Sequence, residues 1–348
     1  MSTLSVNQTL NYTLSNINET LVRAETERCF ETYIVLIPNT SYIVNSAIGC
    51  VVNGILAVLG TFLNALVVSV FWKTAKLRNK VTYFMIMLLC CIDLCVTVVV
   101  HPFHLVNSIA EMTQTARCAY KMIYHVSTVM LSGMSYLTFF VMNVERYLSI
   151  CRPFFHMRNV TRERCLMTCI FLWAVCIVTA VVPLFGVDIQ IFVTTLSLMV
   201  LGGTFFIYVS IYRVANSGLN SRAARTSMHQ SQDTYSVTIE ENTSVIESHG
   251  PGNSTSPKKA VSFLHDIQLA KMYLIVVFST ILLNLPNALV LALFTGRVKS
   301  VDGVVQVKIW TLTLVAMNST FNSLIFFWAN DRLRDEGKRL TKKFFKLN

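Results

Sequence analysis

One acidic residue, Asp93, lies in the middle of the apolar segment LLCCIDLCVTV. A carboxylate at such a position costs several kcal/mol in lipid unless it is protonated or has polar partners. Such a group is either functional or a structural hydrogen-bonding group, and we interpret Asp93 as functional. The amides and hydroxyls that could be its partners at similar depth lie in other apolar segments: Asn64, Ser135, Asn318, Ser319 and Asn322.

Three of these partners share one face of a helix, because Asn322 follows Ser319 and Asn318 by three and four residues. A carboxylate among hydroxyls and amides offers oxygen ligands, which hard cations prefer. The sequence therefore predicts either a sodium ion at Asp93, acting as an allosteric modulator, or a water-filled polar network without an ion, and it leaves both open. It shows no cysteine or histidine spacing typical of another metal site, and we expect no other cofactor.

A second charged group, Glu145-Arg146-Tyr147, ends an apolar segment. Arg146 could pair with Glu145 beside it, or with Asp266, which lies just before a later apolar segment. A pair with Asp266 would hold the ends of two helices together, and breaking it would let them part. The alternative is an arginine that extends its charged group to the lipid–water interface.

The composition predicts that these residues are positioned by membrane-spanning helices. The chain has 348 residues, of which 53% are apolar and 14% are charged, whereas soluble domains carry about 25% charged residues. A bilayer needs roughly 20 apolar residues per helix, and backbone groups in lipid must be satisfied within the segment. We therefore expect an all-α membrane protein, a bundle of seven transmembrane helices. The expected spans are 43–72, 81–106, 119–150, 165–185, 189–212, 271–294 and 309–329.

The distribution of basic residues predicts the orientation of this bundle. With the N-terminus outside, 22 Lys and Arg lie on the cytoplasmic side and 7 on the outer side, as the positive-inside rule requires. The basic charge then needs no nucleic-acid partner. Four N-x-S/T sequons precede the first span, at Asn7, Asn11, Asn18 and Asn39. We expect an extracellular glycosylated tail over 1–42, a seven-transmembrane domain over 43–329 with a disordered third cytoplasmic loop over 214–262, and a cytoplasmic amphipathic helix and tail over 330–348.

Motifs in each span occur in a recognisable order, and together they resemble the rhodopsin-like (class A) G-protein-coupled receptors over nearly the whole chain. Each motif is weak alone, but seven in register are specific. The residues that carry the resemblance are Asn64 with Val67, Leu89-x-x-x-Asp93, Ser135 and Glu145-Arg146-Tyr147, Trp173 with Pro183, Tyr208, Asp266 with Lys271 and Pro286, and Asn318-Ser319-x-x-Asn322.

Several positions depart from the family pattern. The seventh-span N-P-x-x-Y reads Asn322-Ser323-Leu324-Ile325-Phe326, and the sixth-span tryptophan is Asn284. Ser323 keeps the N–H that proline lacks, so we expect a straighter helix. Phe326 lacks the hydroxyl with which a tyrosine could reach toward Tyr208 through water. Both departures could weaken ligand-triggered switching.

The second outer loop is very short and has no cysteine, and the fifth-span proline is Val200. These features are similar to the branch that holds melanocortin, cannabinoid and lysophospholipid receptors. The family's usual disulfide cannot form, because the second outer loop has no cysteine; Lys121 stands at the usual third-span cysteine position, with Cys118 one helical turn earlier. A Cys29–Cys118 bridge is the remaining option, against two free thiols.

The resemblance also implies a ligand pocket in the outer halves of the spans. Thr128 stands where aminergic receptors have an acid, and Ala316 where opsins have the retinal lysine. Lys121 and Arg117 could meet an anionic group or be solvated rim charges. The candidate pocket residues are His104, Lys121, Tyr124, His125 and Thr128, with His101 nearby and with Asn284 and Asn287 deeper.

The function that the resemblance implies is a plasma-membrane receptor, not an enzyme. An unidentified extracellular ligand would activate a heterotrimeric G protein through Glu145, Arg146, Tyr147, Asp266, Tyr208, Asn322 and Phe326. Arrestin and receptor kinases are the further expected partners, beside the lipid bilayer. The alternatives are a polytopic ion or solute transporter or channel that uses Asp93 and its neighbouring amides as an ion path, and a constitutively biased or decoy receptor.

Overall fold

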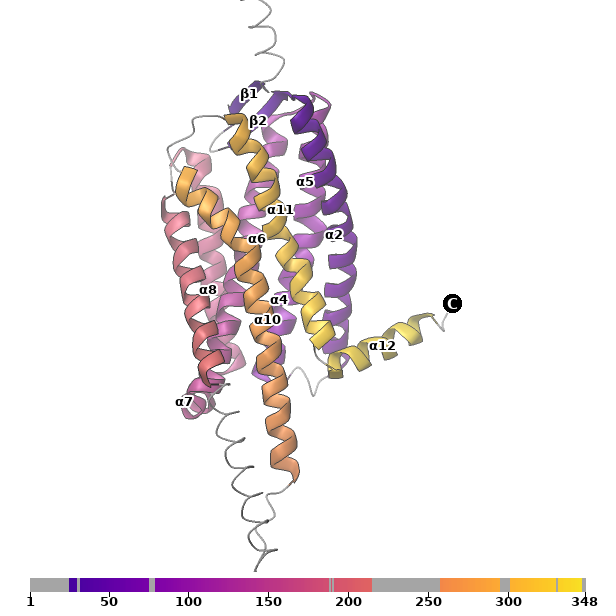
Figure 1. Cartoon of the computed structure of the whole chain (residues 1–348), viewed down its shortest axis with the longest axis vertical. Helices are drawn as coiled ribbons and strands as arrows, with labels where there is room; N and C mark the ends of the chain where they lie inside the picture. The colour runs from indigo at the N-terminus through magenta and orange to yellow at the C-terminus, as the bar shows by residue number, and fades with distance from the viewer. Residues whose placement is uncertain are drawn as a thin grey trace, which may run out of the picture.

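Seven helical spans stand side by side in the computed structural model of the chain (Figure 1). The structure describes residues 25–29, 32–74, 79–187, 189, 191–214, 257–294, 301–329 and 331–345, and the side chains of the sixth span only from residue 274 onward. Six of the described helices are long and apolar enough to cross a membrane, and the apolar helical segment Leu274–Val290 supplies the seventh. The predicted all-α fold is confirmed.

Six of the seven spans are longer than the sequence predicted, because the helix continues past the apolar stretch at most ends, and the fifth keeps its predicted length. Span one is α2 (Thr40–Lys73), and span three is α6 (Cys118–Cys151). The fourth consists of α8 (Arg162–Val181) and the short η2 (Val182–Phe185), and the fifth is the helix Ile191–Val214. The sixth and seventh are α10 (Pro257–Phe294) and α11 (Val301–Ala329).

The second span changes its winding part-way along. It comprises α4 (Val81–Cys95), the π-helical turn η1 (Val96–Val100) and α5 (His101–Met112). Pro102 at the start of α5 has no N–H, and its ring would clash with the carbonyl of Val98 in a regular α-helix. A wider turn of the backbone relieves this clash.

The sequence predicted only a tail before the first span, but the structure forms two strands there. It contains an antiparallel hairpin of β1 (Glu25–Cys29) and β2 (Thr32–Ile37). The run TYIVLI is rich in β-branched and aromatic residues, and Ile34 and Val35 are buried. The hairpin caps one end of the bundle (Figure 1). We call this end the hairpin end and the opposite end the Arg146 end.

The third-loop boundary also differs from the prediction. Helix α10 already begins at Pro257, inside the stretch 214–262 that the composition assigned to a disordered loop. Proline favours the first position of a helix, and Pro257 is the first residue of α10. Residues 215–256 lie outside the described part of the chain.

Helix α12 (Asp331–Phe345) leaves the bundle sideways at the Arg146 end (Figure 1). It is the amphipathic helix that the sequence predicted, and its Leu333 is buried. A side chain at Gly337 would collide with the Phe327 ring, since a Cβ there would lie 2.5 Å from Phe327 Cε2. The small residue therefore lets α12 pack against α11.

A hydrophobic cluster fills the half of the bundle toward the Arg146 end. Phe326, the residue that replaces the family's tyrosine, is fully buried in it, and Tyr208 packs against the cluster. Helix α11 runs through Asn322–Phe326 without a break, and Ser323 Oγ donates to the Thr320 carbonyl at 3.0 Å. With Ser323 in place of the family's proline, α11 is thus a continuous α-helix at this position.

Candidate functional site

Asp93 is fully buried where α4, α6 and α11 meet. Its Oδ1 accepts a hydrogen bond from Ser135 Oγ at 2.5 Å, and its Oδ2 accepts one from Asn322 Nδ2 at 3.1 Å. The Ser319 side chain interacts with the same carboxylate. Three of the predicted partners therefore surround Asp93 in the structure.

The other two predicted partners flank the carboxylate without binding it. Asn318 Oδ1 accepts from Thr280 Oγ1 at 3.1 Å, which ties α11 to α10. The described contacts of the Asp93 carboxylate do not include Asn318, whose Oδ1 is turned toward the sixth span. Asn64 Nδ2 donates to the Gly60 and Ser319 carbonyls, whereas Asn64 Oδ1 is buried without a donor.

Arg146 forms a local ion pair at the end of α6. Its Nε donates to Glu145 Oε2 at 2.8 Å, and a second nitrogen donates to Oε1 at 3.1 Å. The side chains of Arg146 and Glu145 are 8% and 2% exposed, so the alternative of an arginine at the lipid–water interface does not fit. The side chain of Asp266 lies outside the described part of the structure, and so does that of Lys271.

Glu145 has two further partners that the sequence analysis missed. His156 Nε2 lies 2.9 Å from Glu145 Oε1, and Thr82 Oγ1 donates to the same oxygen at 3.5 Å. His156 belongs to the short helix α7 (Pro153–Asn159). The sequence spacing of His156 and Glu145 did not predict this contact, because α6 ends at Cys151 and the chain turns before α7 begins. Tyr147 makes a ring contact with Phe206 of the fifth span, with centroids 6.3 Å apart.

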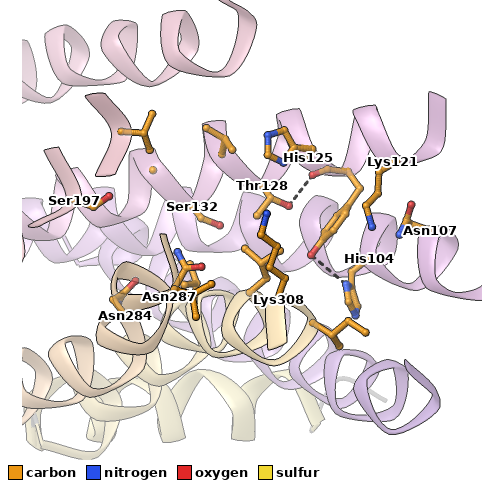
Figure 2. Close-up of a pocket in the computed structure, with 18 of the residues that line it drawn as sticks. His104, Asn107, Lys121, His125, Thr128, Ser132, Ser197, Asn284, Asn287 and Lys308 are labelled. Carbon is orange, nitrogen blue, oxygen red and sulfur yellow. Dashed lines mark hydrogen bonds between the residues drawn. The ribbon is translucent and has the colours of Figure 1, made fainter. Parts of the chain in front are cut away.

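A cavity of about 280 Å³ opens between the helices toward the hairpin end. All seven predicted pocket residues line it, from the second, third and sixth spans (Figure 2). They are His104, Lys121, Tyr124, His125, Thr128, Asn284 and Asn287. His101 does not, because its Nδ1 lies 2.8 Å from Asn53 Oδ1 in the α2–α5 interface.

The charged residues of the cavity wall include a buried pair. Lys121 Nζ lies 3.0 Å from Glu111 Oε1, and the two side chains are 14% and 1% exposed. The Tyr42 hydroxyl also donates to Glu111. Lys121 is therefore neither an open anion site nor a solvated rim charge, and Arg117 is exposed outside the cavity lining. The sequence analysis missed Glu111, because this residue follows the predicted end of the second span.

Hydrogen bonds within the third span and between it and the second span fix the orientation of several cavity side chains. Thr128 Oγ1 donates to the Tyr124 carbonyl at 2.7 Å, and the Tyr124 hydroxyl lies 3.2 Å from His104 Nδ1 (Figure 2). His104 Nε2 is buried without a partner, as is Ser132 Oγ deeper in the cavity. The wall thus offers polar groups whose hydrogen-bonding capacity the described residues leave unused.

Cys29 and Cys118 form a disulfide with their Cα atoms 5.6 Å apart. The bridge joins the hairpin to the first residue of α6 and so holds the hairpin over the bundle. Cys29 is 2% exposed. The other cysteines in the described part of the chain are free thiols.

Replacing Cys29 by serine is expected to release the hairpin while the bundle stays folded. The helices pack on one another, and the hairpin contacts α5 and α6. Limited proteolysis of the purified protein should cleave the hairpin region severalfold faster, with little change in the thermal melting of the bundle. Cys151→Ser is the control, since Cys151 is a free thiol. Equal cleavage of the two variants would contradict a role of the bridge in holding the hairpin.

Comparison with known proteins agrees with the geometry of the bundle. Residues 63–195, which include Asn64, Asp93, Ser135 and Glu145-Arg146-Tyr147, match the model of the 7 transmembrane receptor (rhodopsin family). Over these residues the chain is similar to the rhodopsin-like, class A receptors. This is a family of receptors rather than enzymes, and the chain is a multi-pass membrane protein.

The chain is also similar to a curated protein. Over 149 residues it is 32% identical to melanopsin of Branchiostoma belcheri, and the match covers 43% of this chain and 20% of melanopsin. The chain thus spans about a fifth of the length of this relative. The likeness concerns the family, and placement near the melanocortin, cannabinoid and lysophospholipid receptors stays a prediction.

Proposed function

We propose that this rhodopsin-like chain is a plasma-membrane receptor with an extracellular N-terminus. A ligand bound in the cavity at the hairpin end would activate a heterotrimeric G protein at the Arg146 end. The observation that carries this proposal is the buried pair of Arg146 and Glu145, which closes the end of α6 opposite the cavity. The family match supports it.

The pair at the Arg146 end has the properties of a releasable contact. Glu145 joins α6 to α7 through His156 and to α4 through Thr82. Separating a buried ion pair is costly unless another group replaces each partner. A G protein that supplies an acceptor for Arg146 would therefore bind the open state preferentially, and ligand and G protein would shift the same equilibrium.

The Asp93 cluster lies between the two ends and suits a modulating ion. The carboxylate, the Ser135 hydroxyl and the unpartnered Asn64 Oδ1 are oxygen atoms of the kind that sodium prefers. A bound sodium ion would be held by residues of α2, α4 and α6 beside α11. It would thereby favour the packed arrangement of these helices over one in which they separate.

The departures from the family pattern support a receptor with a high basal activity. One helical turn from Asn284, which replaces the family's sixth-span tryptophan, Thr280 is fully buried and donates to Asn318. Small polar side chains thus occupy this part of α10, and a hydroxyl connects it to α11. With less side-chain volume at this contact, the helices are expected to change their packing at lower cost.

The other expected partners and the expected glycans are placed at opposite ends of the bundle. Arrestin and receptor kinases would bind at the Arg146 end, and glycans would be attached on the opposite side. Asn7, Asn11 and Asn18 lie outside the described residues. Asn39 caps α2, because its Oδ1 accepts from the Tyr42 amide at 2.8 Å, and glycosylation through Nδ2 would leave this bond in place.

Replacing Arg146 by alanine is expected to lower the signal at least about tenfold. Cells that express the receptor with a panel of G-protein sensors should show a basal signal above that of cells without it. The variant loses the group that would bind the G protein, whereas surface staining of a tagged receptor should persist. His156→Ala is the matched control, because it removes another partner of Glu145 and leaves Arg146 in place. A signal that Arg146→Ala leaves unchanged would overturn the proposed coupling.

A further inference from the structure

The carboxylate and the lysines of the cavity at the hairpin end already interact within the chain. Among the described residues, its lining carries Glu111, Lys121 and Lys308. Glu111 accepts from Lys121 Nζ at 3.0 Å and from the Tyr42 hydroxyl, and its side chain is 1% exposed. Lys308 takes part in an interaction of its own. Taking one partner out of a buried ion pair is strongly unfavourable, so a charged ligand would compete with contacts that the protein already makes.

An unpaired carboxamide lies at one side of the cavity. Asn107 of α5 lines the cavity and is 4% exposed. Among the described residues, its side chain has no hydrogen-bond partner. Buried polar groups are usually paired. Both the donor and the acceptor of this amide are therefore left for a bound molecule.

Two further carboxamides line the opposite side. In Figure 2, Asn284 and Asn287 of α10 lie on one side of Lys308, and Asn107 lies on the other. Asn284 Nδ2 donates to the Thr280 carbonyl at 2.8 Å, which leaves its Oδ1 as an acceptor. Asn287, like Asn107, has no hydrogen-bond partner in the described part of the chain. The cavity thus has uncharged amides at two sides.

The chemistry of a carboxamide determines what it binds best. It presents an N–H donor and a carbonyl acceptor side by side. A ligand group that also has a donor beside an acceptor can form both hydrogen bonds at once, as asparagine does with the edge of a nucleic-acid base. A carboxylate has no donor and an ammonium group has no acceptor. Either of these would leave half of the carboxamide unpaired.

We propose that the ligand of this cavity is a small neutral molecule with an amide-type group at each end of an apolar body. One amide pairs with Asn107, and the other pairs with Asn284 and Asn287. A cavity of about 280 Å³ suits a small molecule. The inference rests on the proposed function of this cavity as the ligand site of a receptor. The apolar body contacts the apolar part of the lining, which includes Val129, Leu312 and Val315.

The test uses direct binding, which does not depend on signalling. The full chain is purified into lipid nanodiscs, and thermal stabilisation is titrated with 4-acetamidobenzamide, 4-acetamidobenzoate, 4-acetamidobenzamidine and acetanilide. The first three have nearly the same shape and are neutral, anionic and cationic, whereas acetanilide lacks the second amide. We expect 4-acetamidobenzamide to bind about tenfold more tightly than each of the other three.

Two variants remove the carboxamides one side at a time. Asn107→Leu and Asn287→Leu should each weaken 4-acetamidobenzamide about tenfold, because each removes the hydrogen-bond partner of one amide. Acetanilide has a single amide, so only one of the two variants should weaken it. A general disturbance of the cavity would instead weaken both probes in both variants.

Melting without probe controls for the fold of these variants. The two replaced amides have no partner in the described structure, so neither variant should melt at a lower temperature than the unmodified protein. Asn159→Leu is the matched control for binding, because Asn159 belongs to α7 at the Arg146 end. It should leave the affinity of all four probes unchanged.

A third variant tests why the cavity does not select an anion. Glu111→Gln leaves Lys121 without its carboxylate. This variant should bind 4-acetamidobenzoate severalfold more tightly than the unmodified protein does, with little change for 4-acetamidobenzamide. The preference for a neutral ligand would then follow from the pairing of Lys121 with Glu111.

The inference falls if the anionic or the cationic probe binds the unmodified protein more tightly than 4-acetamidobenzamide, if this neutral probe gives no stabilisation, or if both leucine variants weaken acetanilide. Such a result beside a signal that depends on Arg146 would leave the proposed receptor function intact and overturn only the ligand class. Binding of the neutral probe as expected, in a protein without any Arg146-dependent signal, would support the ligand class and overturn the proposed coupling.

Discussion

Replacing Gly60 by alanine is expected to destabilise the bundle by about 1–3 kcal/mol, a typical cost of overpacking a filled core. A Cβ at Gly60 would lie 2.5 Å from Thr320 Oγ1 and 2.5 Å from Thr97 Cγ2. Both contacts are much closer than van der Waals distance. The α2 backbone therefore approaches α11 and η1 at this glycine too closely for any side chain.

The two threonines cannot easily move aside. Thr320 and Thr97 are 4% and 0% exposed. Thr320 Oγ1 donates to the Leu56 carbonyl at 3.3 Å, and Thr97 Oγ1 donates to the Leu94 carbonyl at 3.0 Å. Rotating either hydroxyl away would break a buried hydrogen bond, so the added methyl group must push helices apart. Leucine at Gly60 should prevent folding altogether.

Gly54 is a matched control on the same helix. A Cβ at Gly54 would meet nothing within 4 Å. Alanine has a higher helix propensity than glycine by about 1 kcal/mol at both positions, so the difference between the variants reports the packing at Gly60. Thermal melting of the purified proteins in one detergent measures it. Equal melting temperatures for Gly60→Ala and Gly54→Ala would contradict the close contact of α2 with α11 and η1.

Replacing Asp93 by alanine is expected to destabilise the bundle by about 2–5 kcal/mol, because two buried donors lose their acceptor. The Ser135 hydroxyl and the Asn322 amide both donate to this carboxylate, and each orphaned buried donor costs about 1–3 kcal/mol. Asp93→Asn should cost much less. Its amide oxygen can accept from Asn322, and its amide nitrogen can donate to Ser135 Oγ.

The pair of Asp93 variants also decides between a sodium site and a water-filled network. Asparagine keeps the hydrogen bonds but removes the negative charge that would bind sodium. The unmodified protein should melt at a higher temperature in sodium chloride than in potassium chloride at the same ionic strength, whereas Asp93→Asn should melt equally in the two salts. Equal melting temperatures of the unmodified protein in the two salts would indicate a polar network without an ion. A sodium-specific shift that persists in Asp93→Asn would place the ion elsewhere.

Local sequence determined the elements of this protein. Each span is an apolar segment of membrane-crossing length, and a helix is the way for such a segment to satisfy its own backbone in lipid. The positions of Asp93, Asn322 and Ser135 in their spans were enough to predict that they meet. The seven predicted pocket residues were likewise brought to one cavity, because residues at similar depth and on inward faces of neighbouring helices must lie close together.

Tertiary structure decided which partner each polar group takes. Asn318 and Asn322 share a helix face, yet Asn318 binds Thr280 and Asn322 binds Asp93, because the rotation of α11 gives each turn a different neighbour. The Lys121–Glu111 pair and the His156–Glu145 contact likewise join residues on different helices. Periodicity within one helix carries no information about such contacts. They depend on the relative depth, rotation and spacing of packed helices, which only the assembled bundle sets.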